Sequence, residues 1–197
     1  TRPPAPSFTL TRRDHAVEIR WDNLPEIQLK ARIAGYGETR FIGYRVWKLY
    51  DWRVRPSLLP ERERWALLGS FGADTAFGGL PLSAITDSSV DYTRILFEQR
   101  LYPVGHYRIV DHDPLNGFDY VYVVTTVFEN KVFEGNFTRL VRTESPLDSD
   151  FGARVVPRAE ARENASSVWV VPNPFRATAD WDRPITYGDM LTRHIDF

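Results

Sequence analysis

The chain has 197 residues, a formal net charge of -1 at pH 7, 43% hydrophobic residues and 26% charged residues. This composition is that of a globular protein long enough to bury a core, and the near-zero charge offers no bulk attraction to nucleic acid or to an anionic membrane. The chain contains no Cys, which excludes disulfides, thiolate catalysis and Cys-based zinc sites. No apolar run in it is long enough to span a bilayer.

Most of the chain is predicted to form β-strands. In residues 16–21 (AVEIRW), the apolar Val17, Ile19 and Trp21 alternate with two charged residues, as in a strand with one buried face. Similar segments, separated by Gly, Pro, Asn and Asp, stand at 7–11, 41–50, 65–71, 105–111, 119–128 and 153–157. This spacing predicts an all-β sandwich. Only residues 88–101 (SSVDYTRILFEQRL) are predicted to be helical, with Ser88 or Ser89 as the N-cap.

One long stretch, HYRIVDHDPLNGFDYVYVVTTV, resembles the E–F corner of a fibronectin type III domain. The matching positions are Asp111, Leu115, Gly117, Tyr120, Tyr122 and Val124, and both Trp21 and GYRV (43–46) also match that family. The resemblance implies an Ig-like antiparallel β-sandwich over residues 1–157. Because such a domain needs about 100 residues, it also implies a long insertion between the C and E strands, at about 51–104. The expected core contains Trp21, Tyr44, Val46, Tyr120, Tyr122 and Val124.

The end of the chain carries a second resemblance. VWVVPNPFRATADWDRP is similar to the entry of a hook-cap or sorting-type Ig-like domain of bacterial secreted proteins, and RHIDF is similar to the beginning of its second strand. The resemblance implies a linker at 158–167, then an incomplete second domain or extended tail at 168–197. It also implies an extracytoplasmic bacterial protein, in the periplasm, at the cell surface or secreted. The opening TRPPAP has neither Met nor a signal pattern, so we expect a trimmed or partial product.

A cluster of possible cation ligands lies in the predicted E–F turn. Asp111, Asp113 and Asn116 could supply oxygen ligands to calcium, but Pro114 and Leu115 interrupt the spacing that such a loop needs. These residues are also the usual turn formers, and a turn is the preferred interpretation. The sequence contains no nucleophile elbow, HExxH motif or phosphate loop. We therefore expect a chain that is not an enzyme and needs no cofactor or metal.

Two sets of apolar residues are candidates for binding a partner. Strands 41–50 and 119–128 are apolar on both faces, whereas a solvated outer face would be polar. Either the insertion or a partner protein must therefore cover the outer side chains Trp47, Leu49, Val121 and Val123. The tail residues Val168, Trp169, Val170 and Val171 could add to an exposed sheet edge.

Three classes of function remain open. The first is a non-catalytic structural or protein-interaction module that docks on a larger assembly. The second is an accessory subunit of a membrane-bound respiratory or photosynthetic complex, on its extracytoplasmic side. The third is a carbohydrate-binding module, in which Trp47, Trp52 and Trp65 would stack on sugar rings; filling the core is the commoner role for such residues.

Overall fold

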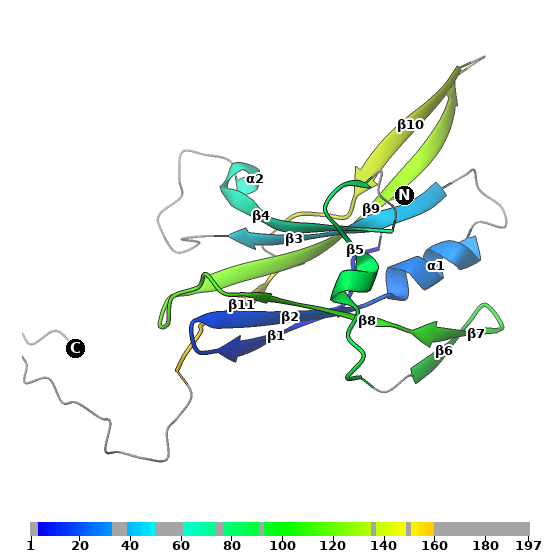
Figure 1. The fold of residues 1–197 in the computed structure, drawn as a ribbon. Helices are drawn as coiled ribbons and strands as arrows, with labels where there is room; N and C mark the ends of the chain where they lie inside the picture. The colour runs from blue at the N-terminus through cyan, green and yellow to red at the C-terminus, as the bar shows by residue number, and fades with distance from the viewer. Residues whose placement is uncertain are drawn as a thin grey trace, which may run out of the picture. The chain divides into compact units, whose positions relative to one another are not determined.

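The computed structural model describes residues 4–32, 39–49, 61–73, 77–90, 93–134, 137–148 and 151–159. All of them belong to one unit, Thr1–Glu160; the second unit, Ala161–Phe197, lies outside the described residues. The described part is an all-β sandwich of two packed sheets (Figure 1), as the sequence predicts.

The smaller sheet has three antiparallel strands in the order β1-β2-β8. Its strands are β1 (Phe8–Arg13), β2 (Ala16–Asp22) and β8 (His106–Asp111). In β2 the alternation predicted from the sequence is realised, because Val17, Ile19 and Trp21 all enter the core.

The larger sheet has the order β10-β9-β3-β4-β5. Its strands are β3 (Thr39–Leu49), β4 (Trp65–Gly72), β5 (Leu80–Pro81), β9 (Tyr120–Glu134) and β10 (Phe137–Glu144). A short strand, β11 (Ala153–Val155), pairs with residues 120–122 of β9, and β10 pairs with residues 127–134. Strand β9 is longer than predicted, and β10 was not predicted at all.

The core lies between the two sheets. All six predicted core residues are buried in one cluster, which confirms the expectation for Trp21, Tyr44, Val46, Tyr120, Tyr122 and Val124. Trp21 packs edge-on against Tyr44, with ring centroids 5.8 Å apart, and lies 5.7 Å from the ring of Tyr107. The aromatic area buried here contributes to the stability of the fold through the hydrophobic effect.

The predicted helix at 88–101 is wrong. Residues 93–104 form a β-hairpin of β6 (Thr93–Phe97) and β7 (Arg100–Val104), joined by Glu98 and Gln99. The side chains follow a period of two, with Ile95 and Phe97 partly buried and Leu96 exposed. A hairpin of this kind satisfies the backbone locally and needs no helical periodicity.

Helices and short turns occupy the connections between strands. They are α1 (Leu24–Arg32), α2 (Glu61–Arg64) and the 3-10 turn η2 (Leu82–Ile85). The first of these was not predicted; it begins where Asp22 accepts a hydrogen bond from the backbone N–H of Leu24 (3.0 Å). Figure 1 shows α1, the β6–β7 hairpin and the end of the β9–β10 hairpin on the same side of the sandwich.

Candidate interaction surface

Four of the side chains that the sequence predicts to bind a partner lie on the outer face of the larger sheet. They are Trp47, Leu49, Val121 and Val123. Leu49, Val121 and Val123 are buried there in a cluster with Trp65, and Leu147 from the segment after β10 packs against them. The chain therefore covers this part of the face itself. Partner binding at these residues stays a prediction.

The same outer face is also covered at its other end. Phe77 forms a buried cluster with Ile42 and Val127, and its ring lies directly over Gly43, where an added Cβ would approach a ring carbon to 2.6 Å. Gly43 thus permits Phe77 to pack flat on the sheet. Trp65 and Phe77, which lie within the predicted insertion at 51–104, thus cover part of this face, and Leu147, which lies outside it, covers another part.

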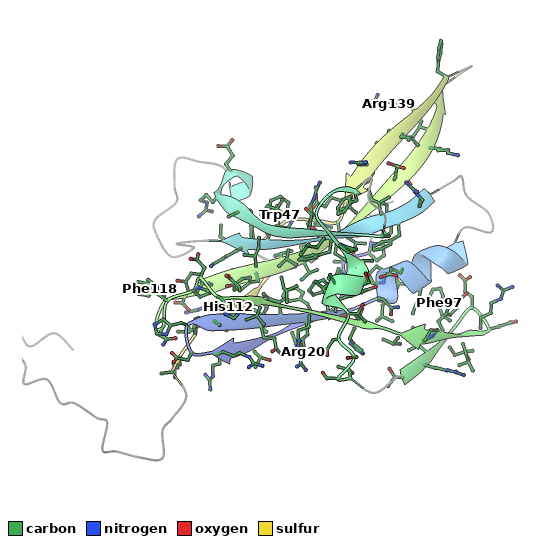
Figure 2. The ribbon with its side chains drawn as sticks, in the orientation of Figure 1. Arg20, Trp47, Phe97, His112, Phe118 and Arg139 are labelled. Atoms are coloured by element: carbon green, nitrogen blue, oxygen red, sulfur yellow. The ribbon has the colours of Figure 1, made fainter. Side chains whose placement is uncertain are left out.

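Trp47 (Figure 2) joins this outer face to a polar network. Its indole Nε1 donates to Oε1 of Glu144 (2.9 Å) and to the hydroxyl of Thr125 (3.0 Å). Arg45 pairs with the other carboxylate oxygen of Glu144 at 2.8 Å. This network ties β3, β9 and β10 together, and it leaves Trp47 half-buried.

The candidate cation ligand Asp111 is engaged by protein groups. Its Oδ2 lies 2.8 Å from the ammonium of Lys48 and accepts a hydrogen bond from the hydroxyl of Tyr122 at 2.8 Å. Its Oδ1 accepts the backbone N–H of Asp113 (3.1 Å), and the Asp113 carboxylate lies 3.5 Å from Lys48. The positive charge beside these carboxylates is therefore that of Lys48, which was not among the site residues predicted from the sequence.

Asn116, the third candidate ligand, has different partners. Its amide donates to Asp14 (2.6 Å), and its oxygen accepts the backbone N–H of His15 (3.0 Å), so it fastens the β1–β2 turn to the turn between β8 and β9. The hydrogen bonds of Asn116 and those of Asp111 are therefore made to different residues. Among the described residues, no group of three or more His, Asp or Glu side chains is placed to hold a metal ion.

A second polar cluster holds α1 on the core. The hydroxyls of Tyr44 and Tyr107 both donate to Oε1 of Glu26, at 3.0 and 2.8 Å. Burial raises the pKa of both phenols, and the negative charge of Glu26 raises each pKa further. Both tyrosines therefore remain protonated donors at neutral pH.

The tryptophans proposed for sugar stacking are placed as follows. Trp65 is buried, and Trp47 is half-buried with its indole N–H engaged. Trp52 lies outside the described residues. Neither of the two described rings forms an exposed platform.

Five of the exposed large apolar side chains of the described residues lie on the two hairpins, and five others do not: Leu67, Leu80, Leu115, Phe118 and Phe151. On β6–β7, Leu96 (69% exposed) lies directly opposite Leu101 (63%). On β9–β10, Phe137 is 80% exposed and Leu140 is 55% exposed, and Val132 is also exposed. Exposed apolar groups of this size that cluster on one side of a domain indicate an interaction site.

Basic residues accompany these apolar side chains. The β6–β7 hairpin contains Arg94 and Arg100 against Glu98, and the β9–β10 hairpin contains Lys131, Arg139 and Arg142 against Glu129, Glu134 and Glu144. Figure 2 shows Arg139 on the projecting part of the β9–β10 hairpin, away from the sandwich core. The β9–β10 hairpin is therefore formally neutral, and the β6–β7 hairpin carries one net positive charge.

Neither hairpin was predicted from the sequence as a site, although signals for both exist. A Gly-Asn pair at 135–136 follows a β-rich run and is typical of a two-residue hairpin turn. The predicted tail site, Val168, Trp169, Val170 and Val171, lies outside the described residues.

Comparison with known proteins adds no relative. No protein-family model, curated protein or solved structure matches the chain. Among the described residues, no helix is long and apolar enough to cross a membrane.

Proposed function

We propose that this chain is a non-catalytic structural and protein-interaction module of an extracytoplasmic bacterial protein, and that it docks on a larger assembly. The observation that carries the proposal is the gathering of exposed Leu96, Leu101, Phe137 and Leu140 on two hairpins at one side of the sandwich. Burying a side chain of this size is worth about 1.5–3 kcal/mol. A partner that covered several of them would bind through the hydrophobic effect.

The proposed Ig-like character of the module has its own support at the E–F corner. The hydroxyl of Tyr120, at the start of β9, accepts a hydrogen bond from the backbone N–H of Leu115 (2.9 Å). Gly117 adopts a positive φ of 84° in the same turn, and its N–H donates to the carbonyl of Pro157 (2.9 Å). A tyrosine that reaches back to upstream backbone is a feature of immunoglobulin-like sandwiches. The extracytoplasmic location is proposed from the sequence resemblances alone.

The rigid part of the molecule suits a scaffold role. Trp21, Tyr44 and Tyr122 are fully buried, and the two sheets are joined by the ion pair of Lys48 and Asp111. Strand β9 runs from this core into the β9–β10 hairpin, and an ordered base of this kind reduces the conformational entropy lost on docking.

Hydrogen exchange of the isolated chain and of the native assembly tests this proposal. We expect amides of residues 93–104 and 130–142 to gain protection in the assembly, while the core strand β2 exchanges equally in both. Equal exchange of all described segments in the two samples would contradict the proposal, because no surface would then be covered by a partner.

A further inference from the structure

Asn116 and Gly117, in the turn between β8 and β9, form the only Asn-Gly pair in the chain. In such a pair the backbone nitrogen of the glycine can attack the side-chain amide carbon of the asparagine. Glycine has no Cβ to obstruct this approach, and its backbone has the widest choice of φ and ψ. Every other Asn of the chain precedes a residue that has a Cβ. The sequence therefore concentrates this chemistry at one turn.

In the folded structure both reacting groups are engaged by neighbours. The side-chain amide of Asn116 donates to Oδ1 of Asp14 (2.6 Å), and its oxygen accepts the backbone N–H of His15 (3.0 Å). The backbone N–H of Gly117 donates to the carbonyl of Pro157 (2.9 Å). The attacking nitrogen and the amide that it attacks are thus held by different segments, so the reaction requires local opening of this turn.

We propose that Asn116 is a site of spontaneous deamidation, that opening of these hydrogen bonds controls its rate, and that the reaction permanently releases the β1–β2 turn. The nitrogen of Gly117 forms a bond to Cγ of Asn116 and loses its proton, while the side-chain nitrogen takes up a proton and leaves as ammonia. Water then adds to either carbonyl carbon of the resulting succinimide ring and opens it. The products carry an aspartate or an isoaspartate at position 116, and the reaction needs no oxidant or cofactor.

The products cannot restore the original contact with the β1–β2 turn. The amide nitrogen of Asn116 is the donor that bridges to Asp14. After deamidation a carboxylate stands there, which offers no donor and repels the carboxylate of Asp14. His15 has a left-handed φ of 49°, which is uncommon for a residue with a Cβ, so a released turn can relax to a commoner conformation. Opening therefore permits the reaction, and the reaction then favours the open turn.

Incubation of the full chain at mildly alkaline pH, followed by peptide mapping with tandem mass spectrometry, tests the site. We expect Asn116 to be converted to a mixture of aspartate and isoaspartate before any other Asn of the chain. Isoaspartate distinguishes the succinimide route from direct hydrolysis of the side-chain amide, which gives aspartate alone. Formation of aspartate alone, earlier conversion of Asn130, or an intact Asn116 would each overturn the proposal.

Two variants test whether the hydrogen bonds control the rate. Asp14→Ala removes the acceptor of the Asn116 amide and should raise the rate of conversion by about two- to tenfold, the factor by which one hydrogen bond shifts an opening equilibrium. Arg12→Ala, at an exposed position of the neighbouring strand β1, is the matched control and should leave the rate unchanged. A rate that Asp14→Ala does not raise, or that both variants raise equally, would contradict control by this contact.

A third variant, Asn116→Asp, imitates the aspartate product and tests the release. We expect the backbone amide of His15 to exchange with solvent about two- to tenfold faster than in the wild type, while the core strand β2 exchanges equally. In the double variant Asp14→Asn, Asn116→Asp the donor and the acceptor change places, so the hydrogen bond can form again and protection of His15 should return. Unchanged exchange in Asn116→Asp, or no recovery in the double variant, would show that deamidation does not release the turn and would overturn the proposal.

Discussion

The ammonium of Lys48 lies 2.8 Å from the carboxylate of Asp111, and both side chains are almost completely buried, at 0% and 3% exposure. Lys48 projects from β3 of one sheet and Asp111 ends β8 of the other, so the pair joins the two layers. The ring of Tyr120 lies 4.8 Å from the ammonium, and Tyr122 donates its hydroxyl to Asp111. The pair is therefore held by a cation–π contact on one side and a hydrogen bond on the other.

Removing one partner of this ion pair should be strongly destabilising. Lys48→Met leaves Asp111 buried without its cation, and we expect the free energy of unfolding in urea to fall by about 3–5 kcal/mol. The triple variant Lys48→Met, Asp111→Leu, Tyr122→Phe removes all three interdependent groups and should recover most of that loss. A single substitution that costs no more than the triple would show that the pair is not coupled.

Trp21 should be the most sensitive position of the core. It is 2% exposed and contacts the rings of Tyr44, Phe71 and Tyr107, so Trp21→Ala leaves a large cavity. We expect a loss of about 3–5 kcal/mol in the free energy of unfolding. Leu96→Ala, at an exposed position, is the matched control and should change stability little. Comparable losses for both would argue against the core assignment.

Stability should fall at alkaline pH because of Tyr44 and Tyr107. Both have a raised pKa in the folded state, owing first to burial and then to Glu26, whereas an unfolded tyrosine ionises near pH ~10. Their contribution is therefore complete below that pH and is lost as pH rises towards the folded-state values. We expect the double variant Tyr44→Phe, Tyr107→Phe to be less stable at neutral pH but to lose less stability above pH ~10. Parallel curves for the two proteins would contradict this assignment.

Substitutions in the turn of the β6–β7 hairpin should increase the stability of the fold. Glu98 and Gln99 have φ angles of 45° and 63°, a conformation that Asn and Gly adopt more easily in a two-residue hairpin turn. Glu98→Asn combined with Gln99→Gly should raise the free energy of unfolding by about 1 kcal/mol. Gln99→Ala keeps the Cβ and should give no gain. Thermal unfolding measures both, and a destabilised Asn-Gly variant would contradict the turn geometry.

Thermal unfolding should be the same with and without EDTA. Asp111 is paired with Lys48 and Tyr122, and Asn116 with Asp14 and His15, so their folded geometry needs no added cation. A loss of several degrees on chelation would show instead that a bound metal contributes to stability.

The strand pattern of the core could be predicted from the sequence because it depends on local alternation. Trp21 and Tyr122 each lie on an apolar face with a period of two, and the Gly117 turn precedes β9 in the sequence itself. Both features are properties of neighbouring residues, so they needed no knowledge of distant segments. The helix predicted at 88–101 was an error of local interpretation, because β6 pairs only with β7 across a two-residue turn and its β-type residues outweigh a weak helix propensity.

Other features were decided only by tertiary structure. Lys48 appears in the sequence as an ordinary charged residue of a strand; its burial follows from Asp111, which lies 63 positions later and reaches it from the other sheet. Ion pairs between sheets and the coverage of an outer sheet face depend on which distant segments meet, and local pattern carries no information about that.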